Sequence, residues 1–153
     1  MELNLERPLL FFDIESTGLS IVSDSIVELS FVKVFPDNHH EVKTWRVCPW
    51  DYSAGKQKSI DPGASQVNGI KDEDVANEPK FIEIAPEVVE WLKDSDLAGY
   101  NSTKFDLPML AEEIERVRTY CEARIKSAKT SADKKEKAQK TLAAIDIDLH
   151  AKQ

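Results

Sequence analysis

The apolar residues in the first third of the chain are spaced as in β-strands. Residues 8–12 form a short apolar run without alternation, which favours a central strand buried on both faces. Residues 25–35 and 41–48 are rich in β-branched and aromatic side chains and flank a Pro-Asp-Asn turn, which predicts an antiparallel hairpin. In the second strand of this hairpin we expect the inward face to carry Val42, Thr44 and Arg46.

Helical spacing replaces this pattern in the second half of the chain. Residues 81–93 have apolar positions three and four apart, which predicts an amphipathic helix lying on the sheet, and a short strand is expected at 96–100. A long helix should begin at Leu107. It should break near residues 130–133, where Thr-Ser-Ala-Asp fits a capping box that starts a second helix ending near residue 144.

The remaining segments complete the predicted order of elements. Residues 49–79 are irregular, with short helices expected near 63–67 and 72–75, and residues 145–149 resemble the start of another strand. The order β-β-β-α-β-α predicts an α/β fold, in which a mixed sheet begins with antiparallel hairpin strands and carries helices packed on it. Since no helix follows the last strand, we expect one partial domain over residues 1–153, with its C-terminal part incomplete.

Composition agrees with a single domain. A chain of 153 residues that is 41% hydrophobic can form one core. It has no apolar run long enough to span a membrane and no signal-peptide pattern at its N-terminus, so we expect a cytoplasmic protein without a membrane partner. Cys48 and Cys121 stand in unrelated contexts, which favours reduced, buried thiols over a disulfide or a zinc site.

The net charge of -8 is unfavourable for binding phosphates, but the charge is unevenly distributed. Residues 124–140 hold seven basic side chains against two acidic ones. They belong to a helical, basic segment at 111–144, which we interpret as an insertion or an extended helix pair. Both a solvated helix surface and a face that steers nucleic acid are compatible with this segment.

Two carboxylates end the first predicted strand. Asp13 and Glu15 are two residues apart, and because strand side chains alternate, both point to the same side. Like charges at this spacing repel each other, and a hard divalent cation such as Mg²⁺ or Mn²⁺ would relieve the repulsion. A solvated strand end whose acids have no role is the alternative. A third acid, Asp106, lies near the start of the long helix, where the helix dipole also favours a carboxylate.

Together these segments resemble a known family. Phe-Asp-Ile-Glu-Ser-Thr-Gly-Leu at residues 12–19 is similar to the first motif of the DEDD-type (DnaQ-like, RNase H-like fold) 3′→5′ exonucleases. Gly-Tyr-Asn-Ser-Thr-Lys-Phe-Asp at residues 99–106 is similar to the second motif. Residues 64–75 resemble the stretch between the two motifs, except that Asn68 stands where a His more often precedes Gly-Ile. The resemblance implies an RNase H-like fold.

The resemblance also implies a chemistry and a site. Asp13, Glu15 and Asp106 would be the catalytic residues and would bind two Mg²⁺ or Mn²⁺ ions, which activate water and stabilise the leaving 3′-oxygen as nucleoside monophosphates are released. The implied partners are the 3′ end of single-stranded DNA or RNA and, as for the epsilon subunit of DNA polymerase III, a polymerase or another replication or repair protein. The residues implied to bind the substrate are Ile14, Ser16, Thr17, Leu19, Asn101 and Phe105.

The last motif of this family, a His followed five residues later by an Asp, has no match. His39 and His40 fall in the hairpin turn, and no acid follows His150. We therefore assign no general base. One alternative is a catalytically incomplete, exonuclease-like binding or interaction module. A phosphatase of the haloacid dehalogenase type is the other, although Glu15 replaces the second Asp of its Asp-x-Asp motif.

Overall fold

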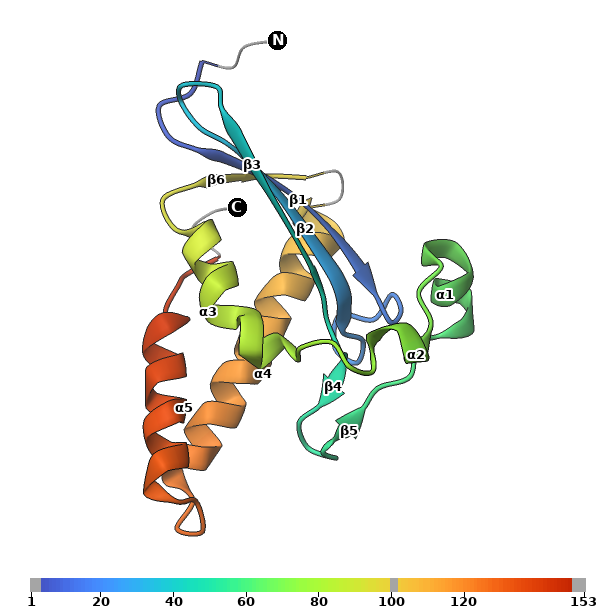
Figure 1. The fold of residues 1–153 in the computed structure, drawn as a ribbon, viewed down its shortest axis with the longest axis vertical. Coiled ribbons are helices and arrows are strands. Elements are labelled where there is room, and N and C mark those ends of the chain that lie inside the picture. The colour runs from blue at the N-terminus through green and yellow to red at the C-terminus, as the bar shows by residue number, and fades with distance from the viewer. Residues whose placement is uncertain (1–3, 100–101, 150–153) are drawn as a thin grey trace.

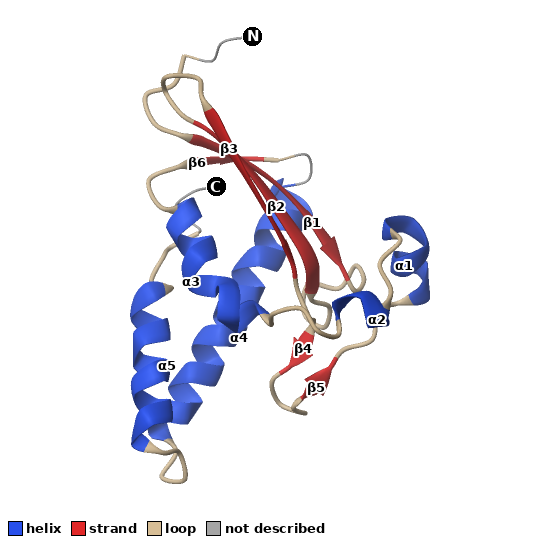
Figure 2. Cartoon of the chain, viewed as in Figure 1, coloured by secondary structure: helices blue, strands red, loops and turns tan. Residues whose placement is uncertain are grey.

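A mixed sheet forms the centre of the computed structural model, which describes residues 4–99 and 102–149 (Figures 1 and 2). Within these residues the strand order is β3-β2-β1-β6, with β1 antiparallel to β2 and parallel to β6. The strands are β1 (Leu9–Ser16), β2 (Ile26–Val34), β3 (His40–Arg46) and β6 (Asp96–Ala98). This sheet, which starts with a hairpin pair, confirms the predicted fold class.

Helices α3 (Phe81–Leu92), α4 (Leu107–Lys126) and α5 (Ala132–Ala144) lie together on one side of the sheet (Figure 2). Their apolar faces and one face of the sheet form the main core. The core side chains that are fully buried and largest include Phe31, Phe81, Leu10, Ile26, Leu29, Leu92, Met109, Leu110 and Ile145. Burial of this apolar surface is the main force that holds the helices on the sheet.

Strand β1 is interior in the sheet, but it is not buried on both faces as its apolar run predicted. Leu10, Phe12 and Ile14 are buried, whereas Phe11 is 39% exposed and Asp13 is exposed. The reason is that α3, α4 and α5 cover one face only, and within residues 4–99 and 102–149 the other face has no comparable cover. One face of β1 therefore stabilises the fold, and the other presents polar groups.

The inward face of β3 was also predicted wrongly. Trp45 is 7% exposed and packs against Phe31, while Val42 is 61% exposed and Arg46 is exposed. The period of two was correct, but the choice of face was wrong, because the large Trp45 ring contributes more buried apolar area than Val42. Cys48 and Cys121 are buried free thiols, as predicted.

The expected strand at residues 145–149 is absent from the described part of the chain, although Ile145 and Leu149 are buried. The backbone amide of Ile145 donates to the carbonyl of Thr141 and so continues the last turn of α5. Apolar side chains can pack without a ladder partner, which is why their spacing alone was misleading. The cap of α5 is Ser131, one residue after the predicted position, and its hydroxyl accepts from the amide of Lys134.

Small elements fill the region between the hairpin and α3. The short helices α1 (Pro62–Asn68) and α2 (Asp72–Val75) are present as predicted, at the right of Figure 1. A small hairpin of β4 (Trp50–Asp51) and β5 (Lys56–Gln57) was not predicted, nor was the π-helix η1 (Ser102–Asp106) that precedes α4. In the described ranges, 4–99 and 102–149, no helix has the length and apolar character needed to cross a membrane.

Candidate active site

Asp13 and Glu15 lie on the face of β1 that the helices do not cover. Asp13 is exposed and Glu15 is half-buried. The register places Glu15 opposite Glu28 of β2, and Arg46 of β3 forms an ion pair with Glu28, with Nε 3.0 Å from Oε1. Immediately after Glu15 the ladder has a register shift, a feature that re-aims the next residues of a strand. The end of β1 therefore carries a concentration of negative charge, and Arg46 neutralises only part of it.

Asp106 joins this cluster from a distant part of the sequence. It is the last residue of η1 and is only 4% exposed. Burial, followed by the charges of Asp13 and Glu15, raises the pKa of Asp106 to about 6. Burial and the charges of Asp13 and Glu28 also raise the pKa of Glu15. The fold therefore brings the three predicted acids into one electrostatic environment, in which each additional negative charge is unfavourable.

The chemistry of these donors suits a hard cation, since carboxylate oxygens are the preferred ligands of Mg²⁺ and Mn²⁺. The arrangement of these side chains suits a metal ion less well than their chemistry does. Among the residues that the structure describes, no group of three His, Cys, Asp or Glu side chains is close enough to hold a metal ion together. Asp13, Glu15 and Asp106 are thus neighbours in electrostatic terms, but Asp106 is buried, Glu15 is half-buried and Asp13 is exposed.

The loop after β1 is fixed by Asp24. The hydroxyl of Thr17 donates to Oδ1 of Asp24 over 2.8 Å, and the amide of Ser20 donates to Oδ2 over 2.9 Å. Gly18 passes so close to this carboxylate that a Cβ at position 18 would lie 2.5 Å from Oδ2. A side chain therefore cannot be accommodated at position 18 without moving Asp24.

The residues implied to bind the substrate differ in their exposure and in the groups that a ligand could contact. Leu19, in the loop between β1 and β2, is 89% exposed. Ile14 and Thr17 are buried, and the buried hydroxyl of Ser16 donates to the carbonyl of Gly18, so these three can present mainly backbone groups. Phe105 is half-buried against the core, and Asn101 lies outside the described residues.

A buried ion pair holds α4 against the same loop, and sequence reasoning missed it. Glu113 is 2% exposed; its Oε2 accepts from the amide of Ile26 over 3.2 Å, and its Oε1 accepts from Arg116 over 2.8 Å. Arg116 also donates to the carbonyl oxygens of Ile21 and Val22, each over 3.0 Å. The available signal was an acid at helical spacing between Leu110 and Val117 on the apolar face of a helix.

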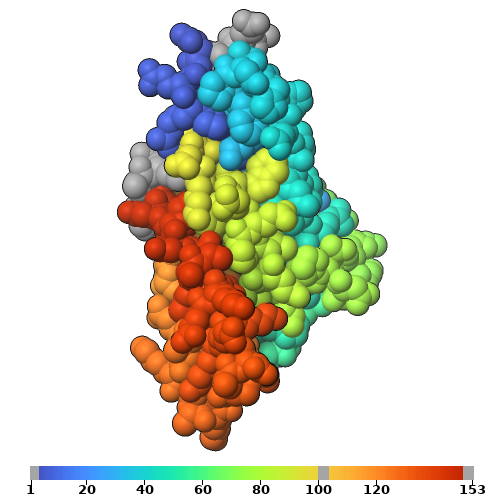
Figure 3. Space-filling model, turned by 60° about the vertical axis from the view of Figure 1, so that its left-hand side comes forward, coloured from blue at the N-terminus to red at the C-terminus, as the bar shows by residue number. Residues whose placement is uncertain are grey.

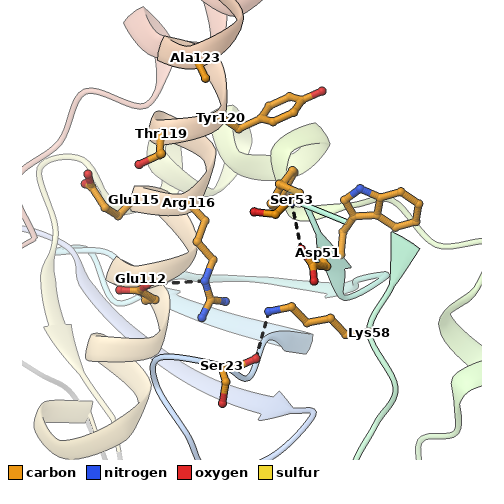
Figure 4. Close-up of a pocket in the computed structure, with 12 residues that line it drawn as sticks. Ser23, Asp51, Ser53, Lys58, Glu112, Glu115, Arg116, Thr119, Tyr120 and Ala123 are labelled. Atoms are coloured by element: carbon orange, nitrogen blue, oxygen red, sulfur yellow. Dashed lines mark hydrogen bonds and ion pairs between the residues drawn. The ribbon is translucent and has the colours of Figure 1, made fainter. Parts of the chain in front are cut away.

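A pocket of about 570 Å³ opens beside this loop (Figure 4). Ser23, Lys58 and Arg116 line it, and the ammonium group of Lys58 donates to the carbonyl of Ser23 over 3.1 Å. Figure 4 shows the guanidinium of Arg116 pointing into this space from α4. Asp13, Glu15 and Asp106 do not line it, so the pocket adjoins the loop and not the acids.

Carboxylates gathered from two parts of a chain are compatible with the two-metal sites that many nucleases use. The family described as Exonuclease, RNase T, matches residues 10–146, and the chain therefore belongs to this family. The match includes both segments that carry the three acids.

Several known proteins are similar to the chain. A PolC-type DNA polymerase III of Latilactobacillus sakei is 34% identical over 105 residues, which are 69% of this chain and 7% of that protein. Protein NEN2 of Arabidopsis thaliana is 32% identical over 109 residues, 70% of this chain and 22% of that protein. The DNA polymerase III subunit epsilon of Treponema pallidum is 27% identical over 116 residues, 67% of this chain and 44% of that protein. The chain thus spans less than half the length of each.

The same fold occurs in a solved structure. Exonuclease I of E. coli, in complex with a dT13 oligonucleotide, superimposes with a TM-score of 0.63 at 18% identity, over 72% of this chain and 24% of that one. At this identity the likeness concerns the fold, and it agrees with the RNase H-like architecture that the sequence predicted.

Proposed function

We propose that the chain is the exonuclease domain of an enzyme that removes nucleoside monophosphates from the 3′ end of single-stranded DNA or RNA. The observation that carries this proposal is the shared electrostatic environment of Asp13, Glu15 and Asp106 in a member of an exonuclease family. Burial and neighbouring negative charge raise the pKa of Glu15 and Asp106, and their ionised forms destabilise the folded protein unless a cation compensates them. Such a cost is typical of functional sites.

In this proposal Asp13, Glu15 and Asp106 hold two Mg²⁺ or Mn²⁺ ions. When bound, the ions supply a hydroxide nucleophile at neutral pH and stabilise the charge on the leaving oxygen. Asp13 and Glu15, on a strand fixed by its ladder, provide rigid ligands. Asp106, with a pKa of about 6, loses its proton readily near neutral pH and so becomes a ligand when a cation approaches.

The substrate residues follow from the exposed groups around the acids. Leu19, at 89% exposure, would pack against the terminal base, because a large apolar side chain in water has much to gain from contact. Backbone groups of Ile14, Ser16 and Thr17 would receive the terminal sugar, since their side chains are buried. Phe105 and Asn101 would border the same nucleotide. Like the polymerases among its relatives, the chain would work with a polymerase or another replication or repair protein, in the cytoplasm.

A second candidate is a catalytically incomplete binding module of the same fold. It is favoured by the absence of a group of three ligands within the described residues 4–99 and 102–149. Such a module would bind a 3′ end without cleaving it.

The test compares Asp13→Ala with His40→Ala on single-stranded DNA and RNA labelled at the 5′ end, with Mn²⁺ or EDTA. Asp13 is exposed, so its replacement should leave the fold intact and abolish Mn²⁺-dependent shortening from the 3′ end. His40 is an exposed residue of β3, and its replacement should change nothing. Equal loss in both variants would contradict the site assignment, and binding without cleavage by the unaltered chain would favour the second candidate.

A further inference from the structure

A groove on the helical side of the molecule carries a concentration of positive charge. It has a volume of about 610 Å³ and lies between β4, the start of α3, the second half of α4 and the middle of α5. Figure 3 shows the surface of α5, in orange and red, beside that of α3 in yellow-green. The charged side chains that line the groove are Lys80, Arg124, Lys134, Lys137 and Glu83.

These four cations are unusual in a protein with a net charge of -8. Within residues 4–99 and 102–149 none of them forms an ion pair, whereas Arg118 on α4 pairs with Glu115 and Lys140 on α5 pairs with Glu136. The one acid in the groove, Glu83, already accepts from the backbone amide of Lys80. The groove therefore has a local excess of positive charge, which favours a polyanion.

Aromatic rings hold two of the cations in place. The ammonium group of Lys80 lies 3.7 Å from the centre of the Trp50 ring, and the guanidinium of Arg124 lies 5.0 Å from the centre of the Tyr120 ring. Each contact reduces the freedom of a long side chain before any ligand arrives. Interleaved cations and aromatic rings are the features by which proteins bind single-stranded nucleic acid without sequence preference.

The groove adjoins the pocket beside the loop that follows β1. Trp50, Tyr52 and Tyr120 line both, and the pocket reaches Ser23, in the loop that follows the first motif. From Asp106, which precedes α4, to Arg124 near its end there are 18 residue steps, which correspond to about 27 Å of helix or about eight nucleotides of a stacked strand. We propose that this groove binds single-stranded nucleic acid upstream of the 3′ end, an inference that rests on the proposed exonuclease function.

The groove also gives a role to the basic segment of residues 124–140. A solvated helix surface would scatter its cations, but Arg124, Lys134 and Lys137 converge on one groove with Lys80 from another element. Lys129 and Lys135 belong to the same segment and do not line it. This difference supplies a matched control within the chain.

The test measures the binding of fluorescein-labelled single-stranded DNA of about 16 nucleotides by anisotropy in EDTA, so that no cleavage occurs. Lys134→Gln with Lys137→Gln removes two phosphate contacts, which should lower the slope of log K against log salt by about 1.4 and weaken binding about tenfold at about 0.2 M salt. Lys129→Gln with Lys135→Gln changes the net charge equally and should leave both quantities unchanged. Equal weakening in the two double variants, or none in either, would overturn the proposal.

Two further arms identify the ligand and separate this inference from the catalytic one. The unaltered chain should bind about 12 nucleotides more tightly than about 4, and the groove variant should lose this gain, because only the longer strand reaches the groove. If inorganic polyphosphate displaces the DNA at the same phosphate concentration, the groove is a general anion patch and the proposal fails. All binding is measured without metal and therefore does not depend on catalysis. A chain that binds through the groove but shows no cleavage when metal is added would contradict the proposed function alone.

Discussion

Replacement of Asp106 by Asn should stabilise the metal-free protein while it abolishes activity. The pKa of Asp106 is about 6 in the folded chain, against an ordinary value of 3.8. The folded state therefore binds this proton more tightly than the unfolded state, and stability falls as the pH rises from about 4 through about 6. A pKa difference of about two units corresponds to a loss of about 2 to 3 kcal/mol in the free energy of unfolding, and the full loss is present at neutral pH. Asn keeps the shape of the side chain and removes the charge.

The assay is urea denaturation in EDTA at several pH values, followed by tryptophan fluorescence. At pH 7.5 the free energy of unfolding of Asp106→Asn should exceed that of the unaltered chain by about 2 kcal/mol, and near pH 4 the gain should vanish. Asp146→Asn is the matched control, because Asp146 is exposed, and it should show no such gain. A loss of stability in Asp106→Asn, or a gain that does not depend on pH, would refute the reasoning from burial and charge.

Three more variants, one of them a control, test interactions elsewhere in the fold. Arg116→Met leaves Glu113 buried without its partner and should lower the free energy of unfolding by about 3 to 5 kcal/mol, whereas Arg118→Met, at a more exposed pair, should cost about 0.5 kcal/mol; urea denaturation distinguishes them. Burial raises the pKa of Tyr52, so the folded state keeps this proton and stability falls as the pH rises above about 10. Tyr52→Phe should reduce that alkaline loss in thermal melts at pH 9 to 11.

The sequence was informative where the period of a pattern decides the structure. The apolar run at residues 8–12 located the first strand, the alternation of strand side chains placed Asp13 and Glu15 on a common side, and period 3.6 located α3 and α4. It was uninformative where contacts with a distant part of the chain determine the local structure. Which face of β3 is buried depends on the helices, and the absence of a strand at residues 145–149 depends on the lack of a ladder there.

The candidate site shows the same division. Local motifs singled out Asp13, Glu15 and Asp106 as candidates, because a carboxylate at the end of a strand or before a helix is visible in the sequence. The shifted pKa of Asp106 was not predictable, since it arises from burial and from charges supplied by β1 across the fold. Glu113 and Arg116 were missed for the same reason: their partners are backbone groups of residues 21–26, about ninety positions away.

Strand β1 separates two kinds of selective constraint by simple alternation. Leu10, Phe12 and Ile14 contact the core, so their replacement changes the stability of the whole domain. Asp13 and Glu15 lie between and beyond them on the uncovered face, where exchange of a side chain leaves the core unchanged. Substitutions on this face can therefore alter or remove its carboxylates while the scaffold persists. Under the proposed function, few changes would separate an enzyme that cleaves nucleic acid from a module that only binds it.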